Sequence, residues 1–152
     1  MKSALVKLLL IVWVLTTLAA CQERKNEQPI VVHVFRDRNG PAASWLSEQI
    51  GNFQKAKIRT SGGKPIVIAT AEPKDYYKTL ADLGGGLKPD LVILDSESDA
   101  QANQALREES QSASRLCSGQ DSCPAFVPSW ASGEGREAAR ALLSFLVSHT
   151  RT

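Results

Sequence analysis

The sequence predicts an α/β fold of three layers built on a small, mainly parallel sheet. Two observations predict it: short apolar runs alternate with amphipathic helical segments, and the runs are apolar at every position instead of every second one. Continuous apolar strands separated by helices are typical of a parallel sheet covered on both faces. The expected order is β-α-β-α-β, then a returning strand and a C-terminal helix.

The first expected strand covers residues 30–35, a run rich in β-branched side chains. After a polar turn, Pro41 suits the first turn of a helix. Apolar residues then recur with the spacing of a helix that buries one face: Ala42, Leu46, Ile50 and Phe53. The second strand is expected at residues 65–69, after a break at Gly62 and Gly63.

The next expected helix opens near Pro73 and ends at the glycines 84–86, with three apolar residues on one face: Tyr76, Leu80 and Leu83. The third strand is expected at residues 91–94, where the chain is apolar again. Residues 100–109 are compatible with a short helix, whereas the polar stretch 110–123 predicts a loop.

The last part of the domain is expected to be a short extended segment and a helix. Residues 124–128 form the extended returning segment, and Ser132 can cap the helix that follows. Glu134 falls in the first turn of this helix, where a negative charge is favourable. Four residues share its apolar face: Ala138, Leu142, Phe145 and Leu146.

The first twenty residues have the layout of a secretory signal: a positive start, an apolar run and small residues before a cut. The run is shorter than the about 20 apolar residues that a spanning helix needs. Residues 18–21, Leu-Ala-Ala-Cys, resemble the lipobox of bacterial lipoproteins, which implies cleavage before Cys21 and diacylglycerol on its thiol. The expected organisation is a signal peptide at 1–20, a lipidated tether at 21–29 and one domain at 30–152.

The lipobox also implies a location. The chain is expected in the cell envelope, facing the periplasm or the cell exterior, with the lipid on Cys21 holding it at a membrane. In Gram-negative lipoproteins an aspartate after the cysteine favours retention in the inner membrane. Gln22 stands at that position, so the outer membrane is favoured in such a host.

The charge balance gives no reason to expect nucleic-acid binding. The 152 residues carry a formal net charge of +2, and the signal segment contains two lysines and no acidic residue. The processed chain therefore has sixteen basic and sixteen acidic residues, a net charge of zero. A neutral chain without a basic stripe lacks the electrostatic footprint of a nucleic-acid partner.

Two cysteines remain beside Cys21. Cys117 and Cys123 flank five polar residues, and a close pair in an oxidising compartment favours a disulfide. The alternatives are free thiols or a metal site. The metal site is disfavoured because two cysteines without a nearby histidine fall short of four ligands.

The candidate ligand-binding residues follow the predicted strands. Right-handed crossovers would bring the carboxyl ends of the three parallel strands to one end of the sheet, where ligands of α/β folds bind. The residues in question are Arg36, Asp37 and Asn39 after the first strand, Glu72 after the second, and Asp95 and Ser96 after the third. Charged surface turns are also common without a ligand, and that alternative stays open.

The sequence contains no catalytic signature and implies no cofactor. His33 is expected to be a strand residue paired with a neighbour, and no serine lies in a G-x-S-x-G motif. The glycines at 84–86 are better explained as a helix end than as a phosphate loop. The alternating acids Asp95, Glu97 and Asp99 could hold a hard cation, but a solvated turn explains them better.

The order of elements resembles bacterial extracellular solute-binding proteins of the type II periplasmic fold, and the match is to their first lobe. The resemblance is carried by residues 75–95, where a glycine-ended helix precedes Lys-Pro-Asp and a strand, and by residues 127–146 with Glu-Ala-Ala and Phe-Leu. Only residues 96–123 occupy the place of the second lobe. The chain therefore resembles a single lobe.

The resemblance implies binding without catalysis. The expected partners are the membrane, a small solute, and an ABC permease or another envelope protein. One alternative is a degenerate or structural envelope lipoprotein that binds no solute. A third hypothesis, an envelope enzyme, is disfavoured because catalytic motifs are missing.

Overall fold

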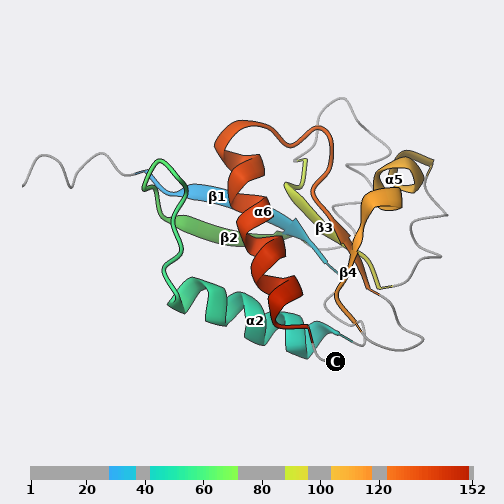
Figure 1. Ribbon diagram of the computed structural model, residues 1–152, viewed down its shortest axis with the longest axis horizontal. Helices are drawn as coiled ribbons and strands as arrows, with labels where there is room; N and C mark the ends of the chain where they lie inside the picture. The colour runs from blue at the N-terminus through green and yellow to red at the C-terminus, as the bar shows by residue number, and fades with distance from the viewer. Residues whose placement is uncertain (1–27, 37–41, 72–87, 96–103, 118–122, 151–152) are drawn as a thin grey trace, which may run out of the picture.

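The computed structural model describes residues 28–36, 42–71, 88–95, 104–117 and 123–150. In this part of the chain, five strands form one mixed sheet in the order β2-β1-β3-β5-β4 (Figure 1). The strands are β1 (Ile30–Phe35), β2 (Ile66–Ala71), β3 (Leu91–Ile93), β4 (Ser114–Arg115) and β5 (Pro124–Phe126). The helices are α2 (Ala43–Lys55), α5 (Gln104–Glu109), the 3-10 turn η1 (Ser110–Ser112) and α6 (Gly133–Ser148).

Strand β1 lies at the centre of the parallel part of the sheet. It pairs with β2 over six residues, from Ile30 opposite Ile66 to Phe35 opposite Ala71, and it pairs in parallel with β3 on its other side. The α/β class and the strand positions are therefore confirmed. Strand β2 begins one residue later than predicted and runs two residues further, to Ala71.

The sheet is mixed, whereas the sequence predicted a mainly parallel one. Strand β5 is antiparallel to β3, and β4 is antiparallel to β5. The physical reason lies in the connections, because parallel neighbours need a crossover of a dozen or more residues, whereas a short connection returns the chain beside itself. Residues 116–123 are too few for a crossover, so β4 and β5 form a hairpin.

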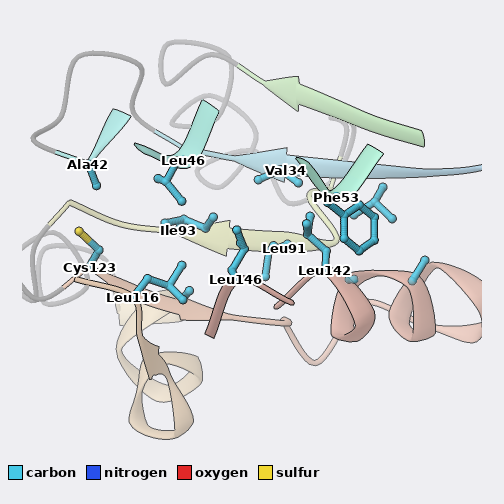
Figure 2. Close-up of a cluster of buried hydrophobic side chains, with 14 of the residues drawn as sticks. Val34, Ala42, Leu46, Phe53, Leu91, Ile93, Leu116, Cys123, Leu142 and Leu146 are labelled. Atoms are coloured by element: carbon cyan, nitrogen blue, oxygen red, sulfur yellow. The ribbon is translucent and has the colours of Figure 1, made fainter. Parts of the chain in front are cut away.

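The hydrophobic core lies on both faces of the sheet. On one face, α2 and α6 cover Val32, Val34, Leu91 and Ile93, as Figure 2 shows for the residues that it labels. On the other face, Leu106 of α5 packs in a smaller cluster with four strand or strand-flanking residues: Phe35, Val92, Leu94 and Phe126. Successive strand residues alternate between the two clusters, as the pleat of a strand requires.

Two opposed valines of β1 and β2 are exposed, and the helix predicted at residues 73–86 lies outside the described residues. Val31 and Val67 stand directly opposite each other on β1 and β2, and 43% and 42% of their surfaces are exposed. They lie on the sheet face away from α2 and α6. An apolar run in the sequence does not distinguish a strand buried along its whole length from one that is exposed near its start.

The two long helices bury the faces that the sequence predicted. Leu46, Ile50 and Phe53 of α2 are buried, and so are Ala138, Leu142 and Leu146 of α6. Ser132 occupies the N-cap position of α6 as expected, but its side chain makes no capping hydrogen bond. Phe145 is half-buried and packs edge-on against Phe53, which joins the two helices.

The segment predicted as a loop at residues 110–123 contains structure. It holds η1 and β4, and Leu116 is buried because it follows the strand into the core. The predicted disulfide between Cys117 and Cys123 is present, with a Cα–Cα distance of 5.2 Å, and it closes the β4–β5 hairpin. The predicted helix after Pro73 and the glycines 84–86 lie outside the described residues.

Candidate functional site

Two of the predicted binding residues lie where β1 and β3 end, here called the carboxyl end of the sheet. Arg36 follows β1 directly, and Asp95 stands two residues after β3. The chain passes from β1 to β2 on one side and later to β3 on the other, so the strand order reverses at β1. In open α/β sheets the crevice at such a reversal is the usual place for a ligand.

Arg36 is buried, with 9% of its surface exposed, and it is tied to the start of α2. Its Nη1 donates to the carbonyl oxygen of Ala43 at 3.1 Å and to Oγ of Ser47 at 2.9 Å. The Ser47 hydroxyl in turn donates to the same Ala43 oxygen at 2.8 Å. The guanidinium therefore fixes the first turn of α2 against the end of β1, which is a structural role.

Asp95 is half-buried beside Leu94, which lies in the core. The Leu94 N–H donates to the carbonyl oxygen of Pro124 at 2.9 Å, so β5 holds the chain in place just before the carboxylate. The antiparallel strand thus positions Asp95 at the carboxyl end.

Asp37, Asn39, Glu72 and Ser96 lie outside the described residues, as do Glu97 and Asp99. Arg36 and Asp95 are the two candidates whose positions are described, and both stand at the predicted end of the sheet.

A histidine–aspartate pair lies near the opposite end, where β1, β2 and β3 begin, here called the amino end. Nδ1 of His33 is 3.5 Å from Oδ2 of Asp90. The His33 N–H donates to the same oxygen at 2.9 Å, and the Asp90 N–H donates to the His33 carbonyl oxygen at 2.8 Å. His33 is therefore a strand residue paired with a neighbour, as predicted.

Sequence reasoning missed a set of polar contacts that fasten the loop before β2 to the first turns of α6. Nζ of Lys64 is 2.7 Å from Oε2 of Glu134. The N–H and the hydroxyl of Ser61 donate to the two carboxylate oxygens of Glu137. The partners stand 70 and 76 positions apart in the chain, and no local pattern signals a contact over that separation.

Trp130 stands just before α6 and packs against the smaller core cluster, and its indole N–H donates to the carbonyl oxygen of Pro89 at 2.9 Å. Because a buried indole needs an acceptor, this bond also fixes the chain that leads into β3.

Within the described ranges, no cluster of three or more His, Cys, Asp or Glu side chains is arranged to hold a metal ion. No described helix combines the length and the apolar character needed to cross a bilayer.

Comparison with known proteins identified no relative of this chain. No family model, curated protein or solved structure was found to match this chain.

Proposed function

We propose that this chain is a membrane-anchored lipoprotein that binds a small solute or an envelope partner without catalysis. The proposed site is the carboxyl end of the sheet, in a single lobe like that of the type II solute-binding proteins. The observation that carries the proposal is the reversal of strand order at β1, next to Arg36 and Asp95. The lipobox at Cys21 supports the anchor.

The single lobe affects how tightly a solute would bind. In two-lobed binding proteins, closure of the lobes around the ligand removes it from water. One lobe leaves the ligand partly hydrated, and polar contacts are then weaker than in a dry pocket. We therefore propose weak binding, made effective by confinement of the protein at the membrane beside its partner.

Solute binding is tested by thermal unfolding of the processed chain, starting at Gln22, against amino acids, sugars, oxyanions and metal ions. A ligand at a hundredfold excess over its Kd stabilises the folded state by about 2.7 kcal/mol, which raises the Tm by several degrees. We expect Asp95→Ala to abolish the shift, and Glu48→Ala, which removes an exposed carboxylate on α2, to retain it.

The outcomes separate the two main hypotheses. A shift that survives Asp95→Ala places the binding site elsewhere and contradicts the proposed site. The absence of any shift across these ligand classes favours the alternative of a structural envelope lipoprotein that binds no solute.

The anchor is tested separately by Cys21→Ser. Without the thiol no diacylglycerol can be attached, and we expect the protein to move from the membrane fraction to the soluble fraction. Its mass should lack the mass of the lipid. The matched control is Ser44→Ala, a substitution at an exposed position on α2, which should leave lipidation unchanged. A lipid-free wild-type chain would contradict the proposed anchor.

A further inference from the structure

We infer that the amino end of the sheet is a docking surface for a bilayer that contains anionic phospholipids. This inference rests on the proposed lipid anchor, and it adds which end of the domain faces the membrane. The basic surface in question consists of five residues: Lys55, Lys57, Arg59, Lys64 and Lys88.

The topology brings these residues to the same end. Helix α2 carries the chain from the carboxyl end of β1 to the amino end of β2, so its last residue, Lys55, lies at the amino end. Lys57, Arg59 and Lys64 belong to the loop that follows. This loop lies beside the start of β1 at the left of Figure 1. Lys88 precedes β3, at the amino end of that strand.

The surface is exposed and includes every lysine in the described ranges. Lys55, Lys57, Arg59 and Lys88 are exposed, and Lys64 is half-buried. Charges gathered on one end act together on an approaching surface.

Acidic residues on the neighbouring elements reduce this charge but do not cancel it. Glu134 pairs with Lys64, Glu137 accepts the bonds from Ser61, and Asp90 accepts from His33. Arg136 adds no net charge, because its Nη2 donates to the carbonyl oxygen of Ser129 at 2.6 Å and the Glu109 carboxylate accepts from the N–H of the same residue. Among the described residues, the five basic side chains of the surface therefore stand with three acidic ones, a net charge of +2.

On the side of β5, the same end of the sheet carries acidic residues instead of basic ones. Glu108 and Glu109 of α5 lie on the side of β5, where the Glu109 carboxylate accepts from the Ser129 N–H at 2.9 Å. Among the described residues, the basic surface thus lies on the side on which β2, β1 and β3 begin, and not on the side of β5.

The length and attachment point of the tether indicate that the partner of this surface is the bilayer that holds the lipid. Eight residues, 22–29, separate the lipidated Cys21 from Ile30, the first residue of β1. A chain of eight residues spans at most about 28 Å when fully extended. The proposed lipid therefore holds the amino end within about 28 Å of the headgroups, and it allows the basic side chains to approach them to within the Debye length of about 10 Å at 0.1 M salt.

Charge complementarity completes the argument. Anionic headgroups attract basic side chains placed next to a membrane attachment, and the attraction adds up over the number of charges. Lipid chains and a basic patch commonly act together as two membrane signals. With the amino end on the bilayer, the carboxyl end carrying Arg36 and Asp95 faces away from the membrane, open to a solute or partner.

The test measures acylation of the lysines by an uncharged amine-reactive ester, read by mass spectrometry. The complete lipidated chain is reconstituted in vesicles of phosphatidylcholine alone and in vesicles of equal parts phosphatidylcholine and phosphatidylglycerol. We expect Lys55, Lys57, Lys64 and Lys88 to react about fivefold more slowly on the anionic vesicles, and high salt to abolish the difference.

A reporter lysine controls for general effects of the vesicles. Ser144→Lys places an amine at an exposed position in the second half of α6, away from the amino end, and its reaction rate should not depend on the lipid. The variant Lys57→Glu with Lys88→Glu should remove the protection of Lys55 and Lys64. Arg140→Glu, an equal change of charge per residue at an exposed position of α6, should retain it.

The outcomes distinguish this inference from the proposed anchor. Equal reaction rates on both kinds of vesicle, in a chain whose mass shows the lipid, overturn the docking surface and leave the anchor intact. Equal slowing of the Ser144→Lys reporter also overturns it, because the effect would then lack an orientation. A chain without lipid overturns both.

Discussion

Single residues in this protein tie one element to the next. Arg36 is the main case, because its buried guanidinium donates to the first turn of α2. The sequence placed Arg36 at the end of a strand and predicted a ligand contact there. The structure adds a role that needs no ligand, since the side chain holds the start of the helix in place.

Replacing Arg36 with alanine should therefore destabilise the fold even without ligand. It removes two hydrogen bonds from a charged donor and leaves the Ala43 oxygen with one fewer donor. We expect the free energy of unfolding to fall by about 2 kcal/mol, measured by urea unfolding with an unchanged m-value.

The matched control for Arg36 is Arg140→Ala on the exposed side of α6. It should change the free energy of unfolding by no more than about 0.5 kcal/mol. Equal effects of the two substitutions would contradict the structural role of Arg36.

The pair of His33 with Asp90 was predicted only in part from the sequence. His33 was correctly expected to have a partner, but Asp90 stands 57 positions away. Its identity depends on the parallel pairing of β1 with β3, which no pattern within a strand encodes. The same limit applies to Lys64 with Glu134.

Elements were easier to predict, since their signals are local. The faces of α2 and α6 follow from apolar spacing alone, and all three parallel strands appear where apolar runs occur. The exception is the short strand β4, because a two-residue strand has no period to detect.

Alanine substitutions at two glycines, one in a helix and one in a loop, should change stability in opposite directions. Gly51 lies inside α2 with open space where a Cβ would be, whereas Gly63 lies in the loop before β2 with φ at +81°. Gly51→Ala should raise the free energy of unfolding by about 1 kcal/mol, because alanine favours the helix.

Gly63→Ala is the contrasting variant. The space around its Cβ is equally open, but a side chain strains the left-handed backbone, and we expect a loss of about 1 kcal/mol. Both values are measured by urea unfolding. A loss for Gly51→Ala would contradict the described helix at that position.

At the scale of the whole molecule, the sheet separates the two proposed sites. The basic surface lies at the amino end, and Arg36 and Asp95 lie at the carboxyl end. In the proposed function, this separation lets attachment to the membrane and binding of a solute operate without competing for the same residues.

The sequence by itself determined the three parallel strands and the returning strand β5, the buried faces of the two long helices and the disulfide. These depend on the spacing of neighbouring residues, or on there being only two cysteines left to pair once Cys21 is assigned to the lipid. The tertiary structure alone decided the strand order, the antiparallel return through β5, the exposed valines and the grouping of the basic residues. A period repeats within one segment of chain, whereas strand order and surface charge depend on which distant segments pack together, and only the folded chain fixes that choice.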